Sequence, residues 1–174
     1  MTAQRQERKG NPFGMGFRPG IAFIAVSASL FILAFSPFPA LAATTERVIV
    51  NRYTGLAIEG FDPVAYFVDA RPMVGLRGFE ASQAGAVWRF RNEGNLASFV
   101  AHPDIYGPQF GGYDPIDLAR GVTYAGNPRF WLISGERLYL FGREDNRDAF
   151  AADPQHYLRN AQQRWPDLEQ QLSQ

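Results

Sequence analysis

The sequence of 174 residues contains no cysteine, two histidines and one lysine, Lys9. Without cysteine the chain has no disulfide, no thiolate nucleophile, no CxxC redox motif and no cysteine-ligated zinc or iron–sulfur centre. With its only lysine so close to the N-terminus, it also offers no Schiff-base lysine and no P-loop lysine. The motifs GxSxG, HExxH and GxGxxG do not occur. These absences favour a protein without catalytic activity.

The first 42 residues have the order of a secretory leader. Basic side chains occur within residues 1–20, an apolar run covers residues 21–38, and Pro-Ala-Leu-Ala at 39–42 supplies the small residues of a cleavage site. The alternative is an uncleaved membrane anchor, which is disfavoured because a spanning helix needs about 20 apolar residues and this run is shorter and ends at prolines. We expect a signal peptide cleaved near Ala42 and a periplasmic or secreted protein. Only a leader that stayed uncleaved would bring the protein into contact with the membrane.

The charge of the remaining chain argues against nucleic acid as a partner. Residues 1–42 hold four of the 17 basic and one of the 17 acidic side chains, which leaves a net charge of about −3 for residues 43–174. A nucleic-acid-binding domain normally carries a basic patch that neutralises phosphates. We therefore expect a small-molecule ligand or a protein partner, and we predict no cofactor.

An internal repeat appears when the sequence is shifted by 51 positions. The superimposed pairs include Phe79/Phe130, Trp88/Tyr139, Phe90/Phe141, Asn95/Asn146, Phe99/Phe150 and Pro103/Pro154. Each copy has the pattern of two short strands, at 79–82 and 86–90 or at 130–133 and 137–141, followed by a helix. In the first copy this helix carries Leu96, Phe99 and Val100 and ends before the proline. Aromatic residues on such strands belong in the core more often than in a ligand groove.

The repeat predicts an α+β fold in which two ββα units form one antiparallel sheet with helices packed on it, in a single domain. Residues 47–50 are expected to form an entering strand, and residues 155–164 a closing helix that ends near Pro166. We expect a signal peptide at 1–42 and an N-terminal strand or linker at 43–55. The α+β domain is expected at 56–166, followed by a polar tail at 167–174.

Three stretches resemble the YHS-domain family of secreted bacterial proteins. They are GFDPVAYF at 60–67, AHPDIY at 101–106 and PQFGGY at 108–113, and the resemblance covers residues 56–165. Members carry cysteine or selenocysteine after Gly-Gly-Tyr, whereas this chain has Asp114. A carboxylate cannot form a sulfenic acid or a disulfide, so a redox or soft-metal role does not transfer. The resemblance implies a fold and a compartment but no established activity.

The segment 107–129 lies between the two predicted repeats and is rich in glycine, as ligand-binding loops often are. In the functional interpretation this loop and the segment 62–67 form a ligand pocket. The residues of this predicted pocket are Asp62, Tyr66, Gln109, Gly111, Gly112, Tyr113 and Asp114. In the alternative, the glycines form a turn and Asp114 caps a helix that begins at Pro115, which the sequence favours. The same alternative applies to Asp62, which precedes Pro63.

A metal site has only weak candidates in His102, Asp104 and Asp114, because metal ligands must converge and these residues do not form a known ligand spacing. We expect a secreted or periplasmic YHS-like binding domain without catalytic activity. The alternative is a metal-handling protein or an enzyme that uses Asp114, His102 and Tyr113.

Overall fold

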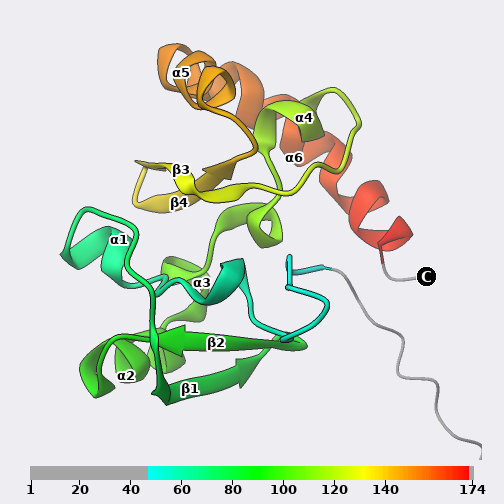
Figure 1. Cartoon of the computed structure of the whole chain (residues 1–174). Coiled ribbons are helices and arrows are strands. Elements are labelled where there is room, and N and C mark those ends of the chain that lie inside the picture. The colour runs from blue at the N-terminus through cyan, green and yellow to red at the C-terminus, as the bar shows by residue number, and fades with distance from the viewer. Residues whose placement is uncertain (1–46, 173–174) are drawn as a thin grey trace, which may run out of the picture. The chain divides into compact units, whose positions relative to one another are not determined.

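The structure is a computed structural model that describes residues 47–172, and these belong to one compact unit. The predicted signal peptide therefore lies outside the described residues. The elements, labelled in Figure 1, follow in the order η1 (Ile58–Gly60), α1 (Ala65–Val68), β1 (Leu76–Gln83), β2 (Ala86–Phe90), α2 (Glu93–Ala101), α3 (Pro103–Tyr106), η2 (Gln109–Gly112), α4 (Pro115–Ala119), β3 (Asn127–Ser134), β4 (Arg137–Phe141), α5 (Glu144–Ala152) and α6 (Pro154–Gln171). The described residues thus form a mixed α+β fold.

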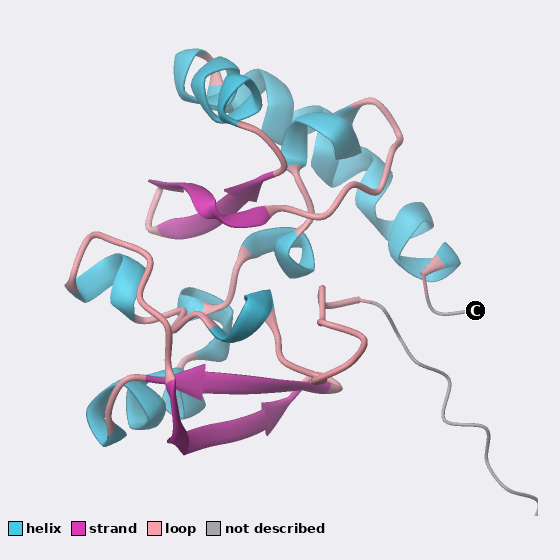
Figure 2. Ribbon diagram, viewed as in Figure 1, coloured by secondary structure: helices cyan, strands magenta, loops and turns pink. Residues whose placement is uncertain are grey.

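The strands form two separate antiparallel hairpins, β1–β2 and β3–β4, as Figure 2 shows. The prediction of one continuous sheet is wrong. At one point along each second strand, a segment of the connecting chain lies at the edge where the other hairpin would pair. The N–H of Ala57 donates to the carbonyl of Val87 in β2, at 2.9 Å, and Leu56 forms a parallel bridge with the same residue. Pro108 makes the corresponding bridge to Leu138 in β4. The edges of β2 and β4 are therefore bridged by connecting segments and not by each other.

The local elements follow the sequence pattern closely. Strand β2 alternates buried and half-buried side chains, as a strand with one face on the core does. Helix α2 starts after Asn92, whose side chain accepts a hydrogen bond from the N–H of Asn95, and it ends before Pro103. The aromatic residues Trp88 and Phe90 are buried, as expected. The spacing of Val100 from Leu96 and Phe99 placed it on the apolar face of helix α2, but 60% of Val100 is exposed.

Residues 47–50 do not form the expected strand. This N-terminal connector makes one isolated bridge, between Val50 and Ala57. Its Ile49 donates to the carbonyl oxygen of Gly111, at 2.9 Å, and accepts from the N–H of Ile58, at 3.3 Å. The connector therefore joins the turns η1 and η2, which lie far apart in the sequence.

Helix α6 is longer than the sequence predicted. It continues through Pro166 to Gln171 and so includes part of the expected polar tail. Trp165 and Leu168 pack against a cluster formed by Tyr113, Leu118 and Ala161. Burial of these apolar side chains offsets the hydrogen bond that the proline removes. No helix within residues 47–172 has the length and hydrophobicity needed to cross a membrane.

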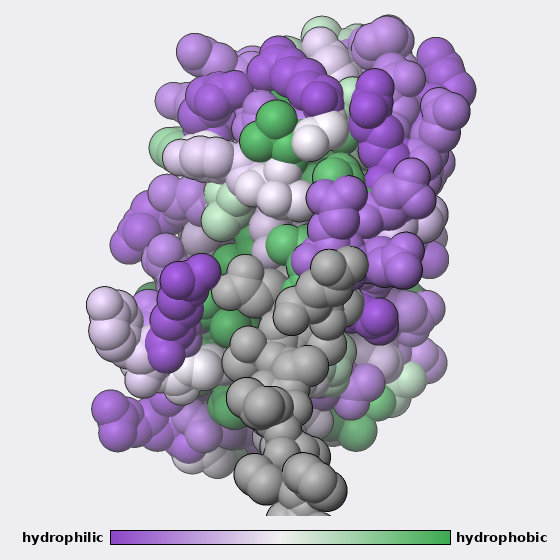
Figure 3. Space-filling model, turned by 90° about the vertical axis from the view of Figure 1, so that its right-hand side faces the viewer, coloured by the Kyte–Doolittle hydropathy of each residue, from purple (hydrophilic) through white to green (hydrophobic). Residues whose placement is uncertain are grey.

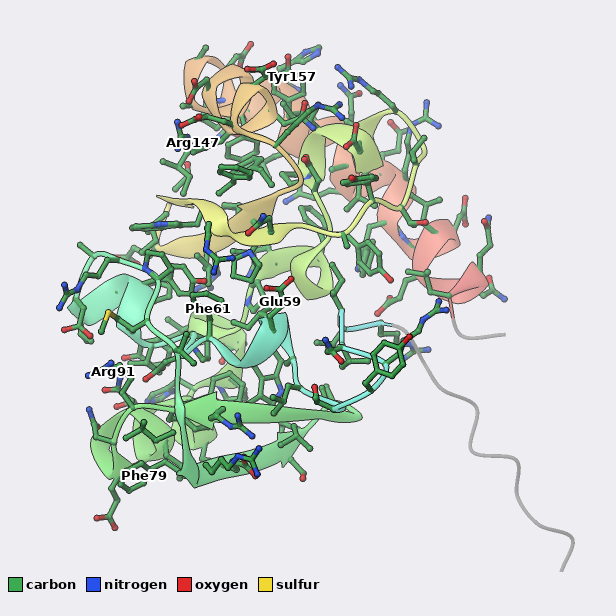
Figure 4. All side chains as sticks on the ribbon, viewed as in Figure 1. Glu59, Phe61, Phe79, Arg91, Arg147 and Tyr157 are labelled. Atoms are coloured by element: carbon green, nitrogen blue, oxygen red, sulfur yellow. The ribbon has the colours of Figure 1, made fainter. Side chains whose placement is uncertain are left out.

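Residues 56–106, the first half, contact residues 108–171, the second half, through an aromatic surface. The hydroxyl of Tyr66 donates to the carbonyl of Pro128 at 2.8 Å, and its ring meets Trp131 edge-on at 5.2 Å. Phe61 lies between the two hairpins (Figure 4), with the guanidinium of Arg129 5.4 Å from its ring centroid. Burial raises the pKa of the Tyr66 hydroxyl above its ordinary value, so this group remains a donor.

Candidate functional site

Asp62 is fully buried at the turn between η1 and α1. Its Oδ1 accepts hydrogen bonds from the backbone N–H groups of Val64 and Ala65, at 2.8 and 3.3 Å. Its Oδ2 accepts from the N–H of Arg91 at 2.8 Å and from the side-chain amide of Asn95 at 2.6 Å. One carboxylate thus caps a helical turn and also ties that turn to the start of α2.

Asp114 is fully buried as well and repeats this arrangement. Its Oδ1 accepts from the N–H of Ile116 at 2.9 Å, which confirms the predicted cap of α4. Its Oδ2 accepts from the N–H of Gly142 at 2.8 Å and from the amide of Asn146 at 2.7 Å. Burial raises the pKa of the Asp114 carboxyl, against the lowering effect of these hydrogen bonds, and the charge of Asp117 adds to the increase.

The segment 107–129, which was predicted to lie between the repeats, contains residues that match the first half. Gly-Tyr-Asp-Pro at 112–115 stands 52 positions after Gly-Phe-Asp-Pro at 60–63. The N–H of Asp62 donates to Met73 at 2.8 Å, and the N–H of Asp114 donates to Tyr124 at 2.9 Å. A search at a fixed spacing of 51 misses this match, because the first half is one residue longer between the aspartate and the asparagine.

The structure does not gather the predicted pocket residues into one site. Four of them, Asp62, Tyr66, Gly112 and Asp114, are buried in the fold. The ring of Tyr113 is also buried, 5.9 Å from the ring of Trp165. Only Gln109 and Gly111 lie together at a cavity wall.

Gly111 shows why the predicted close approach of a ligand does not occur at this turn. Its φ is +62°, a conformation that favours glycine. A Cβ atom at this position would overlap the carbonyl oxygen of Arg47. The backbone that approaches Gly111 is therefore the N-terminal connector of the same chain.

A groove of about 770 Å³ lies beside Gln109 and Gly111. Its lining includes Trp88 and Phe99, which are buried, and an aromatic wall formed by the half-buried Phe110 and Trp165, whose ring centroids are 5.6 Å apart. On the face that Figure 3 turns to the viewer, hydrophobic residues are visible among hydrophilic ones. The polar and charged side chains of the groove are Arg47, Gln83, Asp104, Gln109 and Glu169.

The weak metal candidates His102, Asp104 and Asp114 do not come together as a set of metal ligands. His102 and Asp104 are exposed at the junction of α2 and α3, whereas both oxygens of the buried Asp114 are hydrogen-bonded. Among residues 47–172, no group of three or more His, Asp or Glu side chains is arranged to hold a metal ion.

Comparison of the chain with family models, with curated proteins and with solved structures found no match.

The sequence signal could not have indicated the complete groove, because Arg47, Trp88 and Trp165 come from three distant parts of the chain.

Proposed function

We propose that this protein is a non-catalytic binding domain that acts in the periplasm or outside the cell, and that the groove holds its ligand. The observation that carries the proposal is the groove itself. Its volume, about 770 Å³, is typical of small-molecule sites. Such sites have a mostly apolar lining with a few polar groups that orient the ligand, and here aromatic rings are combined with the side chain of Gln109.

The two buried aspartates have a structural role and are not candidates for catalysis. Every carboxylate oxygen of Asp62 and Asp114 already accepts at least one hydrogen bond from the protein. A general acid or base must reach a substrate within hydrogen-bond distance, and neither side chain is accessible to one. Their role is to hold each turn against the following helix.

We also propose that the two halves are copies of one YHS-like unit. Strands β1 and β2 and helix α2 begin at residues 76, 86 and 93, and β3, β4 and α5 begin 51 positions later, at residues 127, 137 and 144. The buried aspartate–asparagine contact occurs in both halves, with Asn95 and Asn146 also 51 positions apart. In this proposal, Asp114 is the counterpart of Asp62 and does not replace a reactive thiol.

The export part of the proposal predicts a processed N-terminus. Expression of the full sequence in a Gram-negative host should give a periplasmic protein that begins at Ala43, because residues 1–42 have the basic, apolar and small-residue order of a leader. Intact-mass measurement of the periplasmic fraction tests this prediction. A full-length product in the membrane fraction would overturn it.

The binding part predicts that a bulky side chain at the groove blocks ligand. The prediction can be tested with three aromatic probes of similar size, which are the cation benzyltrimethylammonium, the neutral benzyl alcohol and the anion phenylacetate. We expect at least one probe to shift the NMR signals of the Gln109 amide and the Trp165 indole N–H. Gln83→Trp should abolish these shifts, because Gln83 lines the groove at the end of β1. The matched control is Ser134→Trp at the corresponding end of β3, outside the groove.

This experiment has two outcomes against the proposal. If none of the three probes shifts either signal, the groove is not a small-molecule site. If binding survives Gln83→Trp as it survives Ser134→Trp, the probes bind elsewhere and the groove assignment is wrong.

A further inference from the structure

We propose that the ligand of the groove is an organic cation with an apolar body, an inference that rests on the proposed function. Two properties of the groove lead to it, the charge at its edge and the aromatic rings of its wall. Each is set by residues that no sequence motif connects.

Among residues 47–172, two carboxylates and one cation line the groove. Its charged side chains are those of Arg47, Asp104 and Glu169. The guanidinium of Arg47 lies 3.9 Å from a carboxylate oxygen of Glu169, so this positive charge has a negative partner. Asp104 is exposed and has no ion-pair partner within residues 47–172. Among the described residues, Asp104 is therefore the charged side chain of the groove that has no ion pair, and its negative charge attracts a cation and disfavours an anion.

The aromatic wall suits the same kind of ligand. Phe110 and Trp165 are half-buried and meet edge-on, with an angle of 71° between their planes. A cation that lies over such a ring face is attracted by the electrons of the ring, most strongly over tryptophan. The indole N–H of Trp88 already donates to the carbonyl of Gln83 at 3.0 Å. Trp88 therefore has no free donor for a polar ligand group, and the half-buried rings of Phe110 and Trp165 are the aromatic surface left for the ligand.

The three probes test the charge preference, because they differ in charge more than in size. With the protein purified after expression of the full chain, we expect benzyltrimethylammonium to bind about two- to five-fold more tightly than benzyl alcohol. We expect phenylacetate to bind more weakly than either. Dissociation constants follow from titration of the Trp165 indole signal.

A charge-removing variant tests the role of Asp104. Asp104→Asn should weaken binding of benzyltrimethylammonium by about two- to five-fold and leave binding of benzyl alcohol unchanged. The matched control is Asp145→Asn, which removes one exposed charge from the first turn of α5, outside the groove. It should change neither dissociation constant.

The outcomes separate this inference from the proposed function. If the neutral or anionic probe binds in the groove as tightly as the cation, the ligand class is wrong but the groove remains a binding site. The same conclusion follows if Asp104→Asn has no more effect than Asp145→Asn. If no probe binds, both the ligand class and the proposed function fail.

Discussion

Replacement of Asp62 or Asp114 by alanine should lower the free energy of unfolding by about 3–5 kcal/mol in each case. Each substitution removes an acceptor that holds at least three buried or half-buried donors. The amides of Asn95 and Asn146 are buried, so water cannot readily replace the lost carboxylate. Equilibrium unfolding in denaturant measures the loss.

Asp114→Asn distinguishes this double role from a simple helix cap. Asparagine retains an oxygen for the N–H of Ile116, but its NH₂ group would face the N–H of Gly142 and the amide of Asn146, which are also donors. We therefore expect most of the stability to be lost. For comparison, Asp153 is exposed and only caps α6, so Asp153→Ala should cost about 1 kcal/mol. If Asp114→Asn were as stable as the wild type, the second oxygen would have no energetic importance.

The second large effect is expected at the aromatic core of each half. Phe99→Ala and Phe150→Ala should each cost about 3–5 kcal/mol, because both rings are essentially fully buried, with 1% and 0% exposed. Their ring contacts also correspond: Phe99 lies 4.9 Å from Trp88, and Phe150 lies 5.0 Å from Tyr139, measured between centroids. Thermal and denaturant unfolding measure both losses.

Val100 provides the control for this pair, since it lies next to Phe99 on α2 but is largely exposed. Val100→Ala should change the stability by less than about 0.5 kcal/mol. If either phenylalanine variant unfolded at the same midpoint as the wild type, the two rings would not have corresponding places in the core.

The sequence predicted the local elements better than their assembly. Strands β2 and β4 occupy the predicted residues 86–90 and 137–141, since alternating aromatic and aliphatic side chains between turns are a local signal. The separation of the two hairpins depends on which chain segment pairs with each strand edge, and periodicity within a strand contains no such information. The end of α6 was also misjudged, because packing of Leu168 outweighs the local effect of Pro166.

The residues of the groove could likewise be predicted only in part, because they are brought together by long-range packing. Gln109 and Gly111 were predicted as site residues and lie at the groove, but Trp165 and Glu169 were missed because they belong to a distant helix. Another signal was available. Asn95 and its repeat counterpart Asn146 are polar residues at the buried positions of helices that otherwise bury apolar side chains. A buried polar side chain needs a hydrogen-bond partner, which for Asn95 is Asp62. The partner is an aspartate that a search at a fixed spacing does not align.

The N-terminal connector affects the order in which the chain can complete its fold. The hydrogen bond from Ile49 to Gly111 joins one of the first described residues to a turn in the second half. A contact between residues so distant in sequence must close a long loop, which makes it slower to form than a local turn. The start of the described chain is thus fixed in place late, after the local turns and hairpins have formed.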